Sequence, residues 1–473
     1  MIVDETVPPA PGASAAQSPA TQPASVAAQY AWALLDGARM PYNVLVNVFV
    51  FSAYFSTVVI TDAVRGQALW SYITSLSAIL VAIGAPVLGA IADAGGRRKP
   101  WLIATMVAGV PCMCVLWFAV PGMTAGLPLI IAAVIVAYLS FEYAQVFGNS
   151  LLPLIAPGPR IGFLSGLGFA LGNGMGILLF AFFLAAWSWN PHPLFGLDAA
   201  RHEPERAVGI LASVWLIVFS LPFFFLTPDA PGTKMPAGKA IAQGLRTLGG
   251  TVAKVSHYKN VATFLAARMS FNEGFIVMIL FTGIFAEGVL HWSPTMLIVM
   301  ALANSVAASI AGFLAGWIDG RIGSKAGTIL FVAGVLLMNV MQISISRDMV
   351  FFIPVTAADA LHIPGLSALY PTLPDQVFLF MQPFVALLVT GGLVTARALM
   401  AQLSPPTMLN EFFGLYSMSG TATSFIGPLA IGLLTTAFHS QRAGIAVGAV
   451  FLAIGIALMF LVKEERAVAA GKS

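Results

Sequence analysis

Six ionisable residues stand inside long apolar segments of this 473-residue sequence. Three are acids and three are bases: Asp36, Arg39, Glu142, Arg268, Glu273 and Arg397. An ionisable side chain at the centre of a membrane helix costs about 2.5–3.5 kcal/mol on insertion scales, so such residues usually serve a function. Arginine can bind a carboxylate or phosphate through its fork of donors, and a carboxyl group can take up a coupling proton. We expect these residues to bind a polar solute and transfer protons; the alternative is mutual pairing that only stabilises the packing of helices.

The spacing of the polar residues places them on common helix faces. Asp36, Arg39 and Asn43 recur at i, i+3 and i+7, and the fourth apolar segment repeats this spacing with Glu142 and two amides. Polar stripes of this kind face a water-filled cavity or the interior of a bundle. The predicted substrate-binding residues are Arg39, Tyr42, Asn43, Gln145, Asn149, Arg268, Asn272 and Arg397. The predicted proton-coupling residues are Glu142, Glu273 and Asp36.

Membrane helices are the elements that must position these residues. The chain is 59% hydrophobic and 9% charged, with a mean hydropathy of +0.90, whereas a soluble domain carries roughly 25% charged residues. We therefore predict an all-α polytopic membrane protein with twelve spans. The approximate spans are 31–60, 67–92, 100–120, 126–152, 162–188, 207–227, 260–286, 294–318, 326–344, 376–403, 412–437 and 443–462.

The rest of the composition argues against several functions. The net charge of +3 is too small to indicate a nucleic-acid partner. The two cysteines, Cys112 and Cys114, lie inside an apolar segment, so we expect neither a disulfide framework nor a metal site. The sequence shows no phosphate-cradling loop of the P-loop type and no nucleophile constellation. We expect no catalytic residue and no cofactor; the expected partners are a small solute, protons and the lipid bilayer, and the expected state is a monomer.

Lysine and arginine residues orient the chain. If both termini are cytoplasmic, the inner loops and the C-terminal tail hold fourteen of the 22 cations, and the outer loops hold five. This excess predicts an inner-membrane protein with both termini in the cytoplasm. The expected organisation is a disordered N-terminal tail over 1–28, a six-helix bundle over 29–227, a cytoplasmic linker over 228–259, a second bundle over 260–462 and a tail over 463–473.

A short hydrophilic link between the second and third segments reads GAIADAGGRRK over residues 89–99. It resembles the loop 2–3 signature of the major facilitator superfamily, G-x-x-x-D-[RK]-x-G-[RK]-[RK], with an alanine after Asp93 where a cation is usual. A degraded copy, DGRIGSK, follows the eighth segment at residues 319–325, which supports a repeat of six plus six spans. The resemblance implies that these loops latch the cytoplasmic face as the bundles rock. The implied gating residues are Gly89, Asp93, Arg97, Arg98, Asp319 and Arg321.

The second half resembles one branch of that superfamily. The run EFFGLY at 411–416, followed by GTATS at 420–424 and a Gly-Pro pair at 427–428, is similar to the signature of the "unknown major facilitator" branch. That branch includes relatives of the yeast vacuolar amino-acid effluxer. Thr421 stands where the branch usually has lysine, and the opening of the first segment also departs from the branch pattern. The resemblance implies solute transport more firmly than any particular solute.

We therefore expect a secondary active transporter that works by alternating access. Its expected cargo is a small anionic or zwitterionic solute of amino-acid type, exported with proton coupling. The alternatives are a proton-coupled drug or cation antiporter and a non-transporting membrane scaffold or sensor. Two further expectations concern local structure. Pro41 with Gly37 predicts either a discontinuous first helix or an ordinary kink, and the proline-containing segment 345–375 predicts a short interfacial helix or a cap.

Overall fold

The computed structural model describes residues 24–155, 160–188, 194–229, 258–404, 415–416 and 418–463, together with 238, 239 and 242. Twelve helices in this part of the chain are long and apolar enough to cross a membrane. The predicted helical class and the predicted number of spans are therefore confirmed. Most of the predicted tails and of the predicted linker lies outside the described residues. The predicted disordered N-terminal tail over 1–28 extends too far, because α1 already begins at Val26.

The first half supplies six spans. The first runs over Val26–Val59 and changes its helical form three times along its length. Its parts are α1 (Val26–Pro41), the π-helical η1 (Tyr42–Phe49), α2 (Phe51–Tyr54) and the π-helical η2 (Phe55–Val59). The others are α3 (Ala63–Gly95), α4 (Lys99–Val115) with η3 (Leu116–Phe118), α5 (Leu127–Ser150) followed by α6 (Leu152–Ile155), α7 (Arg160–Phe183) with η4 (Leu184–Ser188), and α8 (Glu203–Leu226). Short turns η5 (Leu194–Gly196) and η6 (Ala199–Arg201) precede α8.

The second half supplies the other six spans. The seventh is broken at Phe281 into two helices, and the eleventh begins at Met418, before its regular part. The elements are α10 (Lys259–Leu280), α11 (Thr282–Leu290), α12 (Pro294–Ile322), α13 (Ser324–Ile343), β1 (Met349–Val350), β2 (Ile353–Pro354), η7 (Ala357–Asp359), α14 (Leu373–Leu403), α16 (Ile426–Phe438) and α17 (Gln441–Leu461).

The first span is irregular from Pro41 onward. Proline has no amide hydrogen, so the regular helical ladder cannot continue unchanged through it. Wider π-helical bonds follow, in which Val50 N donates to Leu45 O at 3.1 Å and Ile60 N donates to Phe55 O at 3.0 Å. The chain stays helical, so Pro41 marks a change of helical pitch within a continuous span.

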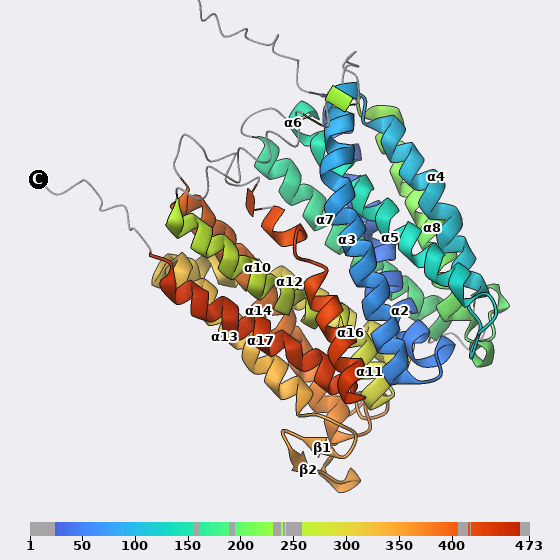
Figure 1. The fold of residues 1–473 in the computed structure, drawn as a ribbon. Coiled ribbons are helices and arrows are strands. Elements are labelled where there is room, and N and C mark those ends of the chain that lie inside the picture. Colours follow the sequence, from blue (N-terminus) through green and yellow to red (C-terminus); the bar gives the residue numbers. More distant parts are fainter. Residues whose placement is uncertain are drawn as a thin grey trace, which may run out of the picture.

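Hydrogen bonds close each half upon itself at the face where α1 begins and α17 ends, which we call the terminal face. Thr227 Oγ1 donates to Ala28 O at 3.1 Å and joins the end of span 6 to the start of span 1. Asn260 Nδ2 donates to Lys463 O at 2.6 Å and joins the start of span 7 to the end of span 12. Figure 1 shows the two halves as separate groups of helices that meet where α3 lies beside α16 and α11 lies beside α2.

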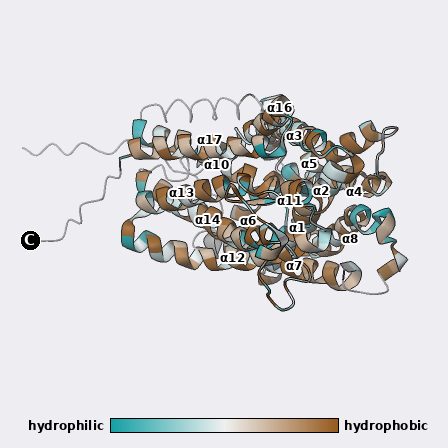
Figure 2. Ribbon diagram, turned by 90° about the horizontal axis from the view of Figure 1, so that it is seen from below, coloured by the Kyte–Doolittle hydropathy of each residue, from teal (hydrophilic) through white to brown (hydrophobic). Residues whose placement is uncertain are grey.

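Apolar side chains cover the outside of the helices as well as the core. Figure 2 shows hydrophobic residues around most of the helical surface. Leu178, Phe225, Phe313 and Phe384 are each more than half exposed on helices of both halves. A surface this apolar belongs in lipid.

The segment between α13 and α14 does not form the short interfacial helix that was one of the two structures expected for residues 345–375, the other being a cap. Its regular structure is an antiparallel hairpin of β1 and β2, in which Met349 pairs with Pro354 and Val350 with Ile353. The only helical turn in it is the three-residue η7. The predicted interfacial helix is therefore wrong, because two apolar dipeptides pair across a two-residue turn before a helix can form.

Candidate functional site

Glu273 is the most deeply buried carboxylate of the predicted set. It lies on α10 and is 2% exposed. Its Oε2 accepts a hydrogen bond from Gly427 N at 2.8 Å, which ties span 7 to the Gly-Pro pair in the first turn of α16. Its Oε1 is buried and makes no hydrogen bond with the described part of the chain. A carboxyl group held in this way, with one oxygen bonded and the other unmatched, can carry a proton.

Glu142 is the corresponding acid of the first half. It is half-buried on α5 and makes no ion pair or hydrogen bond with a described side chain. Tyr42, a predicted binding residue of span 1, is buried and stacks on Phe141 of α5 with ring centroids 3.9 Å apart. The predicted proton-coupling acids thus include one from each half, Glu142 on α5 and Glu273 on α10.

Arg39 pairs with the acid on its own helix. Its Nη2 contacts Asp36 Oδ1 one turn earlier, while Nη1 is buried and has no hydrogen bond with a described residue. Asp36 fits against the glycine-rich span 5, because a Cβ at Gly168 would lie 2.7 Å from Asp36 Oδ2. The Arg39 guanidinium is thus paired with Asp36 through Nη2, while Nη1 stays without a hydrogen-bond partner among the described residues.

Arg268 is held by the protein itself. Its Nη1 donates to Tyr416 O at 2.7 Å and to Ser419 Oγ at 2.6 Å. The guanidinium carbon lies 3.7 Å from the centre of the Tyr416 ring, a cation–π contact. Asn272, one turn later, donates from Nδ2 to Gly420 O at 3.2 Å. Both predicted binding residues of span 7 therefore brace the segment that leads into α16.

The remaining predicted binding residues present free side chains. Arg397 on α14 is exposed, and its guanidinium makes no hydrogen bond with the described part of the chain. Three amide side chains of the first half are also exposed and make no hydrogen bond with the described part of the chain: Asn43, Gln145 and Asn149.

Hydrogen bonds between side chains and backbone atoms hold the loop between α3 and α4. Gly96 has φ +73°, which a glycine adopts without strain. Asp229, which follows span 6, accepts from Arg98 N at 2.8 Å and from Lys99 N at 3.3 Å, so it caps α4. Lys99 Nζ donates to Phe224 O at 2.7 Å.

The predicted gating residues lie at the terminal face, where spans 2 and 8 end. Gly89 lies in α3, Arg97 is exposed, and the side chain of Asp93 lies outside the described part. Asp319 and Arg321 lie in the last turns of α12, and the Arg321 guanidinium stacks 3.8 Å from the Trp317 ring. Residues 411–414 of the EFFGLY run lie outside the described residues as well.

Hydrogen bonds between the two halves occur toward the face opposite the termini. Gln67 Nε2 donates to Thr435 Oγ1 at 2.8 Å, and Gln441 Nε2 donates to Ala63 O at 3.0 Å. Nearer the middle, Ser75 Oγ donates to Phe425 O at 3.0 Å. Within the described part of the chain, no side-chain hydrogen bond joins the halves nearer the terminal face. The halves are thus closed together at the opposite face.

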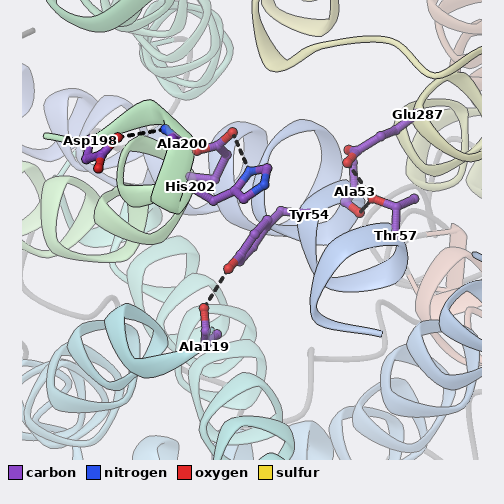
Figure 3. A network of polar contacts seen from close by, with 9 residues as sticks. Ala53, Tyr54, Thr57, Ala119, Asp198, Ala200, His202 and Glu287 are labelled. Atoms are coloured by element: carbon purple, nitrogen blue, oxygen red, sulfur yellow. Dashed lines mark hydrogen bonds and ion pairs between the residues drawn. The ribbon is translucent and has the colours of Figure 1, made fainter. Parts of the chain in front are cut away.

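Glu287 is a residue of this closure that sequence reasoning missed. Figure 3 shows its carboxylate meeting Thr57 of span 1, and Thr57 Oγ1 contacts both Glu287 Oε1 and Ala53 O. Glu287 stands just beyond the predicted end of span 7 at residue 286, so it was left out of the intramembrane acids. Its spacing of 14 residues from Glu273, close to four helical turns, was the available signal.

The first half adds a polar cluster beside this contact. Tyr54 Oη donates to Ala119 O at 2.7 Å, and the His202 ring lies 5.5 Å from the Tyr54 ring (Figure 3). His202 Nδ1 lies 3.3 Å from Glu205 Oε1. These bonds fix the end of span 1 that carries Thr57.

Solved transporter structures share this fold. A D-xylose-proton symporter matches with a TM-score of 0.63 at 13% identity, over 92% of this chain and 97% of that one. The nucleoside transporter NupG matches with a TM-score of 0.64 at 11% identity, over 92% and 98%. A bacterial homologue of the human lysosomal transporter Spinster, in an inward-facing and unoccupied conformation, matches with a TM-score of 0.63 at 14% identity, over 92% and 95%.

Sequence relatives are transporters or autophagy-related proteins. An uncharacterized MFS-type transporter of Bacillus subtilis, YxiO, is 23% identical over 437 residues, which is 92% of this chain and 94% of that protein. Autophagy-related protein 22-1 of Aspergillus niger is 25% identical over 269 residues, but the match spans only 42% of that longer protein. Family and fold identify a membrane transporter of the major facilitator type and not an enzyme. The model of the family described as "Vacuole effluxer Atg22 like" matches residues 54–472, and the chain therefore belongs to this family.

Proposed function

We propose that this transporter exports a small anionic or zwitterionic solute of amino-acid type by proton-coupled alternating access. The observation that carries the proposal is the buried Glu273 of the second half, whose Oε1 makes no hydrogen bond with a described residue. Glu142 on α5 is the corresponding acid of the first half. Neither acid has a cation partner at ion-pair distance in the described part of the chain. Such acids can take up a proton on one side of the membrane and lose it on the other as the halves rearrange.

The roles of the arginines follow from their contacts. Arg39 keeps Nη1 without a hydrogen-bond partner among the described residues, and Arg397 is exposed. A solute with both a carboxylate and an ammonium group could place the first on an arginine and the second on Glu142. Arg268 and Asn272 are engaged with span 11, so we assign them to bracing and not to solute contact.

The direction of transport and the cellular location are parts of the same proposal. The excess of lysine and arginine favours a cytoplasmic terminal face, as in an inner-membrane protein with both termini inside. With the halves closed at the other face, the solute would load from the cytoplasm. The family description as a vacuole effluxer supports export. A monomer suffices for this mechanism, because both bundles lie within one chain.

The test is solute flux in liposomes that contain the purified protein and a panel of carboxylated metabolites. We expect the wild type to drive flux with a pH gradient and to exchange labelled for unlabelled solute without one. Glu273→Gln should lose gradient-driven flux down to the level of protein-free liposomes and keep exchange, because exchange needs no release of a proton. Asp348→Asn, an exposed acid outside the spans, is the matched control and should behave as wild type.

Two results would overturn the proposal. One is the absence of flux for every carboxylated metabolite, with or without a gradient. The other is unchanged gradient-driven flux in both Glu142→Gln and Glu273→Gln.

Proton-coupled antiport of a cationic compound is the second candidate, and one observation favours it. Arg39 is paired with Asp36 and Arg268 is held by span 11, whereas Glu142 and Glu273 have no cation partner at ion-pair distance among the described residues. This candidate predicts that Glu142→Gln abolishes export of a cationic dye while Arg397→Ala leaves it intact. The first candidate predicts that Arg397→Ala weakens flux of a carboxylated solute.

A further inference from the structure

The hairpin between α13 and α14 has an unusual turn. Phe351 and Phe352 connect β1 to β2, with φ of 52° and 63°. Two successive positive φ values define a turn in which glycine and asparagine are normally found, because a bulky side chain is strained there. Two adjacent phenylalanines in this conformation indicate that their side chains serve a purpose beyond turning the chain.

The tip of the hairpin is exposed and apolar. Phe352 is 62% exposed and Ile353 is 65% exposed, with Phe351 at 40%. No ionisable residue occurs from 349 to 358, whereas Arg347 and Asp348 stand directly before this stretch. Phenylalanine and isoleucine at the tip of an exposed turn would be costly in water.

Hydrogen bonds place the tip at the edge of the membrane. Phe352 N donates to Ser344 O at 3.3 Å, so the hairpin folds back onto the residue that ends α13. Arg442 Nε donates to Ile343 O at 2.8 Å, which puts a guanidinium at the same level. The tip thus lies beside the end of span 9, and Figure 1 shows β1 and β2 just beyond the ends of the helices of the second half.

We propose that the hairpin of residues 349–354 anchors the second half in the bilayer interface, with Phe351, Phe352 and Ile353 inserted among the lipids at the face opposite the termini. The occupant is lipid because the tip continues a surface that already faces lipid. Leu337 and Val340, on the last turns of α13, are 56% and 40% exposed. Aromatic and aliphatic side chains next to a charged base are the pattern of segments that lie in the interface.

Depth measurements on spin labels test this anchor. Single cysteines replace Phe352 or Ile353 in a chain without Cys112 and Cys114, and a nitroxide is attached to each in lipid nanodiscs. Collision with oxygen, which concentrates in lipid, is compared with collision with a water-soluble nickel chelate. Two reference labels bracket the scale: Leu337→Cys reports the lipid-facing surface of α13, and Ala200→Cys reports an exposed loop at the same face.

We expect a ratio of oxygen to nickel collisions several-fold higher at 352 and 353 than at 200, and approaching that at 337. Both labelled side chains are exposed, so the labels should leave folding intact, and circular dichroism of each variant checks this. Ratios equal to that at 200 would overturn the proposal, since the tip would then lie in water. Labels shielded from both reagents would also overturn it, since a protein surface or a second copy would then cover the tip.

Discussion

Two arginines of the second half illustrate how one residue type takes two roles. Arg268 is 7% exposed and bonded to a carbonyl, a hydroxyl and an aromatic face. Arg397 is exposed and makes no hydrogen bond with the described part of the chain. A guanidinium held by hydrogen bonds and an aromatic ring of its own protein stabilises the bundle, whereas an exposed one remains available to a solute.

Substitution of Arg268 should mainly lower stability, whereas substitution of Arg397 should leave stability unchanged. Arg268→Gln should lower the free energy of unfolding of the detergent-solubilised protein by about 2–3 kcal/mol, since it removes charged hydrogen bonds from a buried group. Arg397→Gln should change it by less than about 0.5 kcal/mol, as surface substitutions usually do. Thermal unfolding together with liposome flux separates the two variants. Equal destabilisation by both would contradict the assignment of Arg268 as a brace.

The helix α11 approaches the first span closely at Gly283. A Cβ at Gly283 would lie 2.7 Å from Val48 O, a backbone atom that cannot turn aside. Gly283 therefore allows span 7 to approach η1 of the first half closely. Small residues serve this purpose in membrane helices, where close approach replaces the hydrophobic effect as the source of packing energy.

Gly283→Ala should force the halves apart at the face opposite the termini. Overpacking of this kind costs about 1–3 kcal/mol, and here the cost falls on the closed arrangement. Electron–electron distances between spin labels at Thr61→Cys and Phe438→Cys, both exposed at that face, should shift toward longer values. Gly312→Ala is the matched control, because a Cβ there meets no atom within 4 Å. Identical distance distributions in the two variants would refute the argument.

The whole molecule is two bundles joined at one face. Side-chain bonds between the halves, from Gln67, Ser75 and Gln441 among the described residues, run from the middle of the membrane to the face opposite the termini. At the other face, Asp229 and Asn260 each bond within their own half. A transporter that rocks must break the first set of bonds while each half keeps its own.

Thr57 and Glu287 should contribute to this closure as a pair. Their hydrogen bond is made only while the halves are together, so its loss should favour the separated state by about 1–2 kcal/mol, a factor of about 5–30 in population. Thr57→Val and Glu287→Ala, alone and combined, are compared through the same pair of spin labels. We expect the double variant to shift the population no further than either single one. Additive shifts would show that the two residues act independently.

Much of the architecture could be predicted from the residues alone. Lengths of apolar sequence decide the number of spans, because each span needs about 20 residues to cross the hydrocarbon. The membership in the superfamily was also recognisable in short runs such as GAIADAGGRRK, and the family match confirms it. The positions of Glu142 and Glu273 were recognisable because a charge in an apolar segment is expensive wherever it points.

The sequence by itself therefore determined the helical class, the twelve spans and the acids at their centres. Only the tertiary structure decided which of the charges have partners. Arg268 and Arg397 look alike in an apolar run, but the groups that hold Arg268 come from span 11, far away in the sequence. Glu287 and the Phe351–Phe352 turn were missed for the same reason: helical periodicity reports one face of one element, and contacts between elements have no local signal.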